Sequence, residues 1–215
     1  MIRTGGRFAV ALITAALVLV CAAGLAAGWM LQRYDQDQGF RREADRIGDV
    51  LALRPGMTAG DIRAGLGAWS VDMARRVAPH GQVFATAGPH PAHLLLATVA
   101  ASRLDNITVI TRTPGDSSRL PLDCCDAILV RFVYSDLRVE RPTLLSALHR
   151  IVRPGGRLAV IESNPGAPFG AGAQRLARPM VIDELTHNGF ILIADFEHWF
   201  GNTYCVVFRR PDRST

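Results

Sequence analysis

The chain has 215 residues, a formal net charge of +5 and a hydrophobic content of 49%. This length suits one globular domain with an appendage, because about 150 to 170 residues are enough to bury a full core. All 24 basic residues are arginines, a bias typical of a GC-rich bacterial genome, and they form no basic block with interleaved aromatic residues. A nucleic-acid-binding surface is therefore not predicted, whereas acidic substrates or lipid headgroups are compatible with the charge.

Cysteine and histidine spacing indicates neither disulfides nor a metal centre. The four cysteines are Cys21, Cys124, Cys125 and Cys205. Two of them are adjacent and the others stand alone, so no disulfide framework or CxxC motif emerges. His90 and His93 add metal-ligating atoms, but their spacing to the cysteines matches no zinc pattern, and we expect no metal.

Residues 8–31 form an uncharged stretch of 24 residues. As a helix this stretch is about 36 Å long, enough to span a hydrocarbon core of about 30 Å. A cleaved signal peptide usually has a shorter apolar region, and Val20 before Cys21 does not suit a lipoprotein. The sequence therefore predicts a single-pass anchor over residues 1–31 in a bacterial inner membrane, with a long signal peptide as the alternative.

The arginines that flank this stretch are nearly balanced, so they leave the orientation of the anchor undetermined. A polar linker is predicted over residues 32–40, and the globular domain over residues 41–215. Its first element is a helix at 42–53, because Ala44, Ile47, Val50 and Leu51 lie on one helical stripe.

From residue 53 onward, strand-like and helix-like segments alternate, which is typical of a parallel sheet with helical crossovers. Strands are predicted at 57–62, 83–87, 107–111, 127–133 and 158–161, with helices at 68–77, 91–104, 141–152 and 181–188. Arg153-Pro154-Gly155-Gly156 is predicted as a turn that ends the third of these helices. Two further strands, 190–199 and 204–209, are predicted to form a closing antiparallel hairpin.

The segment 57–70 combines a strand that ends in Asp61, a glycine-bearing turn and the start of a helix. Glycines at such a junction allow close approach of the backbone to a ligand, and helix N–H groups point toward its polar atoms. Arg63 is unusual, since the turn favours the smallest side chain there. A nicotinamide-binding motif is not predicted, because its third glycine would be Ser70.

Four segments carry a resemblance to a known family: LRPGMTAGDIRAGLGAWS, Gly115-Asp116 to Leu120-Pro121, CDAILVRFVY and LHRIVRPGGRLAVIES. They resemble class I S-adenosylmethionine-dependent methyltransferases, especially small bacterial ones of the ubiquinone-biosynthesis type. The resemblance covers residues 42–209. It implies an α/β, Rossmann-like, mostly parallel sheet of seven strands completed by the antiparallel C-terminal hairpin, with S-adenosylmethionine as the cofactor.

The resemblance also implies roles for residues of the turn. Asp61, Gly65 and Gly67 match the family motif of an acidic residue followed by GxGxG, whereas Arg63 replaces the first glycine. Asp61 would orient the methionine end of the cofactor, and the backbone from Ala64 to Gly67 would line it. Arg63 could grip the carboxylate of the cofactor, point out to solvent or pair with Asp61.

Two further cofactor contacts follow from the same resemblance. Ala87 stands where the family has an acidic residue that accepts hydrogen bonds from the ribose hydroxyls. Asp116, in a GDxxxLP pattern, matches the residue that meets the adenine amino group. The resemblance thus predicts a cofactor site with two altered positions, Arg63 and Ala87.

Methyl transfer needs placement more than a strong base, so no single catalytic motif is expected. The candidates are Tyr134, Ser135, Asp136 and Glu162, at the carboxyl ends of the fourth and fifth strands, where open α/β sheets bind ligands. Tyr134 and Glu162 could equally finish their strands at the surface.

Two functions are compatible with the sequence. The first is a membrane-anchored methyltransferase that acts on a small or lipid-like acceptor, with its domain in the cytoplasm where the cofactor is made. The second is a non-catalytic relative, a tethered domain for ligand sensing or protein interaction, which a periplasmic location would favour. The oligomeric state is not determined by the sequence.

Overall fold

The computed structural model describes residues 37–87, 92–111, 120–136, 141–166 and 175–212. The chain divides into two compact units, residues 1–43 and 44–215. The described part of the first unit, 37–43, is helical, although 37–40 belong to the predicted linker. The predicted anchor lies outside the described residues, and among those that are described no helix is long and apolar enough to cross a membrane.

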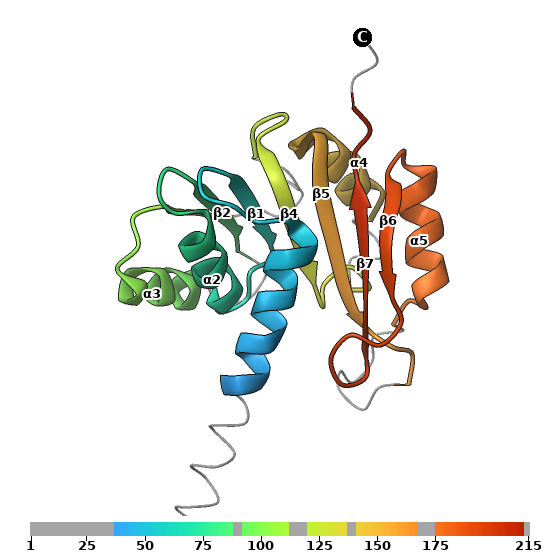
Figure 1. The fold of residues 1–215 in the computed structure, drawn as a ribbon, viewed down its shortest axis with the longest axis horizontal. Helices are drawn as coiled ribbons and strands as arrows, with labels where there is room; N and C mark the ends of the chain where they lie inside the picture. Colours follow the sequence, from blue (N-terminus) through green and yellow to red (C-terminus); the bar gives the residue numbers. More distant parts are fainter. Residues whose placement is uncertain (1–36, 88–91, 112–119, 137–140, 167–174, 213–215) are drawn as a thin grey trace, which may run out of the picture. The chain divides into compact units, whose positions relative to one another are not determined.

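The second unit is built on a sheet whose seven described strands run in the order β3-β2-β1-β4-β5-β7-β6 (Figure 1). The strands are β1 (Thr58–Ile62), β2 (Gln82–Thr86), β3 (Ile107–Ile110), β4 (Cys125–Arg131), β5 (Val152–Ser163), β6 (Ile191–Phe196) and β7 (Thr203–Arg209). Strands β1 to β5 pair in parallel, and β7 runs antiparallel to both β5 and β6. The predicted Rossmann-like sheet with an antiparallel C-terminal hairpin is confirmed.

Helices cover both faces of the sheet. They are α2 (Ala68–Val77), α3 (Ala92–Ser102), α4 (Arg141–Ile151) and α5 (Arg178–His187), in addition to the helical segment 44–51. Segment 44–51 and α2 pack with Ala127 and Leu129 on one face, whereas α4 and α5 pack with Ile128 and Val130 on the other. Because successive residues of β4 enter opposite cores, this strand is apolar throughout, as expected for a parallel strand buried on both sides.

The predicted stripe on the first helix is largely confirmed, because Ala44, Ile47 and Leu51 are buried and Val50 packs against the same core. Arg46 fixes this helical segment to the C-terminal hairpin. Its guanidinium lies 4.0 Å from the centroid of the Trp199 ring and donates a 3.1 Å hydrogen bond to the Trp199 carbonyl oxygen.

The prediction for Arg153-Pro154-Gly155-Gly156 was wrong in one respect. The segment is not a separate turn after α4 but an irregular part of β5, which begins at Val152 directly after the helix. The pairing of β4 with β5 shifts there, since Cys125 pairs with Val152 and Ala127 with Arg157. Gly155 has a φ of +76°, a conformation that glycine accommodates without steric cost. The excess residues form a bulge at the amino-terminal edge of the sheet.

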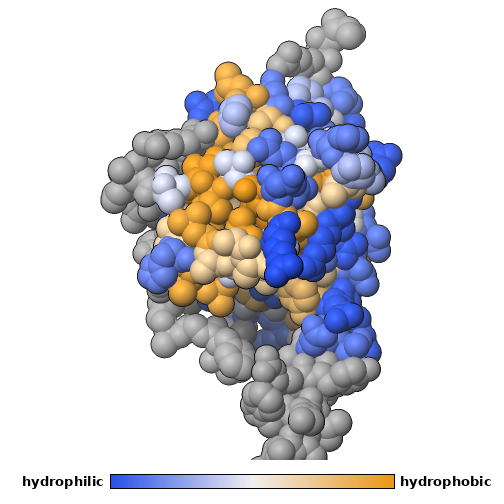
Figure 2. Space-filling model, turned by 90° about the vertical axis from the view of Figure 1, so that its left-hand side faces the viewer, coloured by the Kyte–Doolittle hydropathy of each residue, from blue (hydrophilic) through white to orange (hydrophobic). Residues whose placement is uncertain are grey.

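The side of the second unit that carries α3 shows a broad apolar area bordered by hydrophilic residues (Figure 2). Leu94 and Leu96 of α3 are exposed to 43% and 48%, and β3 is partly exposed along its length. Among the described residues, this side of the unit therefore has less cover than the two faces of the central strands.

Candidate functional site

The turn after β1 is held against the end of β2 by Thr86. The backbone N–H of Arg63 donates to Thr86 Oγ1 at 2.8 Å, and that of Ala64 donates to the Thr86 carbonyl oxygen at 2.9 Å. The Thr86 hydroxyl in turn donates to the carbonyl oxygen of Asp61 at 3.4 Å. Thr86 was not among the predicted site residues, although its position at the end of a predicted strand could have indicated such a contact.

Three residues of this turn have positive φ angles: Arg63 at +55°, Gly65 at +56° and Gly67 at +87°. Glycine adopts this left-handed conformation freely, whereas a residue with a Cβ atom adopts it at a cost of roughly 1 to 2 kcal/mol. The unusual feature of Arg63 is therefore a strained backbone as well as a large side chain. A Cβ atom at Gly65 would meet nothing within 4 Å, so the turn is open there.

Gly67 connects the turn to α2. It is the N-cap of this helix and has no side chain that could cap it. Within the first turn, the Ser70 backbone forms a hydrogen bond with the Asp61 carboxylate, which supplies one of the acceptors that the N-cap lacks. A Cβ atom at Gly67 would lie 2.6 Å from Leu95 Cδ1, which shows how closely α3 approaches. A helix N-terminus beside a glycine turn that is open at Gly65 is a favourable place for the carboxylate or other polar atoms of a ligand.

Asp61 is the buried carboxylate of the site. Asp61 is only 2% exposed, and the Ser70 hydroxyl donates a 2.6 Å hydrogen bond to Asp61 Oδ2. Burial raises the pKa of Asp61 to about 6, a rise that the Ser70 hydrogen bond and the charge of Arg131 oppose. Ser70 was not predicted as a site residue, although it faces β1 from the first turn of a predicted helix.

Arg131 places a cation near this carboxylate from the end of β4. Its guanidinium carbon lies 4.5 Å from the ring centroid of Trp69 and 4.0 Å from that of Phe132. Aromatic faces attract cations, so the two rings hold the guanidinium in place. Nothing in the sequence pattern indicated Arg131, because its role depends on β4 lying beside β1.

The end of β2 is apolar. Ala87 is buried in a small cluster with Ala64, Ala85 and Leu95, and its backbone N–H donates to the Ile110 carbonyl oxygen. The alanine side chain offers no acceptor to a sugar hydroxyl. Asp116, predicted to meet the adenine amino group, lies outside the described residues, as does His90.

Two of the catalytic candidates, Ser135 and Glu162, are buried and bonded to each other, and Arg175 connects them to the exposed Asp136. Ser135 donates to Glu162 through its backbone N–H at 3.2 Å and through its hydroxyl at 3.0 Å. The Arg175 guanidinium forms ion pairs with the carboxylates of both Glu162, at 3.4 Å, and Asp136, at 3.3 Å. Glu162 is fully buried, and burial raises its pKa above the ordinary value.

Tyr134 belongs to a neighbouring contact. Its hydroxyl donates to Glu184 Oε2 at 2.8 Å, which ties β4 to α5. The alternative that Tyr134 and Glu162 finish their strands at the surface is wrong, because both are 0% exposed. Among the four candidates only Asp136 is exposed, so it is the one that faces solvent or a ligand.

The arrangement meets part of what S-adenosylmethionine requires. Asp61 supplies a buried carboxylate for an ammonium group, and Gly65 supplies open backbone close to the N-terminus of α2. At the end of β2, Ala87 does not supply the expected acceptor. The described residues therefore fit the methionine end of this cofactor better than its ribose.

Comparison with known proteins gives relatives in sequence and in fold. The demethylmenaquinone methyltransferase of Streptomyces avermitilis is 31% identical over 138 residues, which are 62% of this chain and 54% of that protein. The ubiquinone/menaquinone biosynthesis C-methyltransferase UbiE of Bordetella parapertussis is 30% identical over 114 residues, 52% of this chain and 42% of that protein. The chain thus spans about half the length of these curated relatives. No protein-family model matches it.

Among solved structures, a SAM-dependent methyltransferase from Aquifex aeolicus superposes with a TM-score of 0.69 at 20% identity, covering 77% of this chain and 88% of that one. At this identity the match shows the fold. Together with the sequence relatives, it confirms the resemblance that the motifs predicted.

The strain at Arg63 predicts that Arg63→Gly stabilises the protein. Glycine removes the cost of a left-handed residue with a Cβ atom, so we expect the free energy of unfolding to rise by about 1 kcal/mol. Chemical denaturation of the full chain in a neutral detergent measures this. Arg63→Ala is the control, because it removes the guanidinium but keeps the Cβ atom; an equal gain in both variants would show that the side chain, not the backbone, is responsible.

The raised pKa of Asp61 predicts a pH-dependent stability. The pKa of Asp61 in the folded state lies above the ordinary value of 3.8, so folding favours the protonated carboxyl group. The contribution of this group to the free energy of unfolding is therefore fully present below about pH 4 and is lost as the pH rises through about 6. Asp61→Asn removes this loss. The free energy of unfolding of Asp61→Asn minus that of the wild type should therefore increase by about 3 kcal/mol between pH 4 and pH 7 in denaturation experiments. A difference that does not change with pH would contradict the burial argument.

Proposed function

We propose that this chain, a relative of the class I S-adenosylmethionine-dependent methyltransferases in sequence and fold, binds S-adenosylmethionine and transfers its methyl group to a small or lipid-like acceptor. The observation that carries the proposal is the buried Asp61 carboxylate beside a glycine turn that is open at Gly65 and leads into the N-terminus of α2. When bound, the cofactor supplies a methyl group on a positively charged sulfur. The contributions of the chain are binding and placement.

Asp61 is suited to an ammonium group. A carboxylate whose pKa is raised by burial is stabilised in its charged form by a nearby cation, so a cationic ligand gains from this contact. Ser70 fixes the orientation of the carboxylate through its 2.6 Å hydrogen bond. Asp61 is therefore the proposed anchor of the amino group, and Ser70 is a positioning residue that acts through it.

Arg63 and the α2 N-terminus are proposed to receive the carboxylate at the same end of the cofactor. Arginine forms strong charge-assisted hydrogen bonds with carboxylates. The left-handed backbone of Arg63 lies in the turn between Asp61 and the helix, where glycine in the related motif leaves only backbone. This compensates in part for Ala87, whose missing acceptor weakens affinity by about tenfold to 150-fold.

The acceptor is proposed to bind near Asp136. Glu162 and Ser135 are buried, and Arg175 links Glu162 to Asp136 at the end of β4. Glu162, held by Ser135, therefore positions the Arg175 guanidinium, and Arg175 in turn holds the exposed Asp136 carboxylate. Glu162 is a positioning residue in this account rather than a group that meets the acceptor.

We further propose that residues 1–31 anchor the protein in the inner membrane with the second unit in the cytoplasm. The uncharged stretch of 24 residues supports the anchor, and the use of a cytoplasmic cofactor supports the orientation. The anchor would then keep the protein at the membrane, where a lipid-like acceptor resides. The alternative, a tethered non-catalytic domain, draws its support from Arg63 and Ala87.

Ligand-induced stabilisation of the full chain in neutral detergent distinguishes the two functions. With S-adenosylmethionine at about 100 times its dissociation constant, the free energy of unfolding should rise by about 2.7 kcal/mol, a shift of several degrees in melting temperature. Ala87→Asp should increase the affinity by about tenfold or more, because it restores a charged acceptor.

Ala101→Asp is the matched control, since it adds the same charge at an exposed position on α3. The variant Arg63→Gly/Ala87→Asp tests the alternative in which the site has decayed at these two positions alone: there the wild type would not respond and the double variant would. If neither responds, the cofactor assignments of Asp61, Gly65 and Gly67 are wrong.

A further inference from the structure

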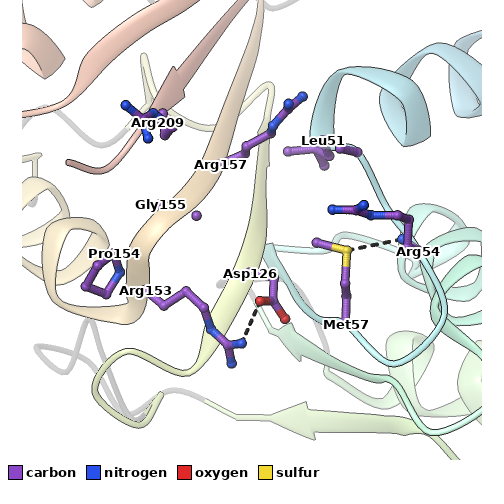
Figure 3. Close-up of a pocket in the computed structure, with 11 residues that line it drawn as sticks. Leu51, Arg54, Met57, Asp126, Arg153, Pro154, Gly155, Arg157 and Arg209 are labelled. Atoms are coloured by element: carbon purple, nitrogen blue, oxygen red, sulfur yellow. Dashed lines mark hydrogen bonds and ion pairs between the residues drawn. The ribbon is translucent and has the colours of Figure 1, made fainter. Parts of the chain in front are cut away.

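A second candidate site lies at the other edge of the sheet, where the parallel strands begin. A cavity of about 320 Å³ opens between the end of the first helical segment, the start of β1 and β4, and the bulge of β5 (Figure 3). The proposed cofactor site lies at the carboxyl ends of the same strands. A ligand in this cavity would therefore bind independently of the cofactor.

The lining of this cavity is strongly basic. It contains four arginines, Arg54, Arg153, Arg157 and Arg209, and a single carboxylate, Asp126. The formal charge of the lining is thus four minus one, or +3. Asp126 is already engaged, because it accepts a hydrogen bond from the Thr58 backbone N–H at 2.8 Å and pairs with Arg153 at 2.6 Å.

Two of these arginines are direct neighbours on adjacent strands. Arg157 of β5 and Arg209 of β7 are register partners, so their side chains leave the sheet on the same face. Like charges in directly opposite positions destabilise a sheet. Arg209 is partly compensated by Asp212 at 2.8 Å, but that carboxylate is 69% exposed, and exposed ion pairs contribute little.

Arg157 and Arg54 have no such compensation within the described part of the chain. Arg157 donates to the carbonyl oxygen of Val50 at 2.8 Å and contacts none of the described carboxylates. Arg54 is exposed, and its side chain extends over Met57 toward the cavity (Figure 3). Both guanidinium groups therefore have N–H donors to offer to a ligand.

We infer that this cavity binds a phosphate-bearing anion. Guanidinium groups bind phosphate oxygens through paired hydrogen bonds, and arginines from three separate segments line this one cavity. A bound anion also relieves the repulsion between Arg157 and Arg209. No aromatic side chain is present among the lining residues, so the cavity lacks a stacking surface for a nucleobase. The chemistry suits an inorganic phosphate, a diphosphate or the phosphate of a lipid headgroup.

Thermal unfolding of the full chain in neutral detergent tests this inference in two arms. In the first, inorganic pyrophosphate replaces sodium chloride at constant ionic strength. In the second, dihexanoyl phosphatidic acid is compared with dihexanoyl phosphatidylcholine. A rise in melting temperature with pyrophosphate identifies a soluble anion as sufficient, whereas a rise with phosphatidic acid alone identifies the lipid headgroup.

Three variants make the test specific. Arg54→Gln and Arg157→Gln should each weaken the response by about tenfold or more in apparent affinity. Arg75→Gln is the matched control, because it removes one charge from an exposed position on α2 and should leave the response unchanged. Arg157→Gln also loses the Val50 contact, so Arg54→Gln, whose side chain is exposed, keeps the test valid if Arg157→Gln folds poorly.

The inference is overturned if neither pyrophosphate nor phosphatidic acid raises the melting temperature, or if Arg54→Gln and Arg75→Gln respond alike. Neither result depends on S-adenosylmethionine, which is omitted from both arms. Failure of this inference and failure of the proposed function are therefore distinguishable.

Discussion

Burial of the Asp61 carboxylate is the constraint on which the candidate site depends. A buried carboxylate needs hydrogen-bond partners, and Ser70 supplies one from the first turn of α2. That contact fixes the start of α2 over the end of β1, which in turn fixes the path of the turn between them. The pKa of Asp61 is raised because its hydrogen bonds to Ser70 and the charge of Arg131 offset only part of the desolvation of the carboxylate. A cationic ligand would stabilise the ionised form further.

Arg63 is the main departure from the glycine turn that is typical of related proteins between β1 and α2. The turn requires positive φ angles at three positions, and only two of them are glycines. Strained backbone persists where the surrounding structure holds it, and here the two hydrogen bonds to Thr86 do so. The structure thus retains the shape of the turn at the cost of strain and places a guanidinium where the related motif has only backbone.

The fold was largely predictable because it follows local patterns. Buried parallel strands read as apolar runs and their helices as amphipathic segments, so the bounds of α2 were predicted to the residue. The bulge in β5 was not, because Pro154 and Gly155 are typical both of a turn and of an irregular strand. The sequence alone could not distinguish a turn from a bulged strand here, because only the pairing of β5 with β4 decides between the two.

The candidate site was predictable where it lies within one segment, as with Asp61, Gly65 and Gly67. It was not predictable where residues far apart in the sequence meet. Arg131 lies over the Trp69 ring only because β4 lies beside β1, and Arg157 and Arg209 are neighbours only through the register of β5 and β7. Tyr134 and Glu162 could not be assigned to core or surface from the strand pattern alone, because α5 and Arg175 cover them.

The pH dependence of S-adenosylmethionine affinity tests the central role of Asp61 most directly. With a pKa of about 6, this carboxylate is mostly protonated at pH 5 and mostly ionised at pH 7. If the ionised form holds the amino group of the cofactor, the affinity of the full chain measured by calorimetry should increase by roughly tenfold between these pH values. Asp61→Asn should bind weakly and without this dependence. An affinity that is the same at pH 5 and pH 7, or a dependence that survives in Asp61→Asn, would contradict the account.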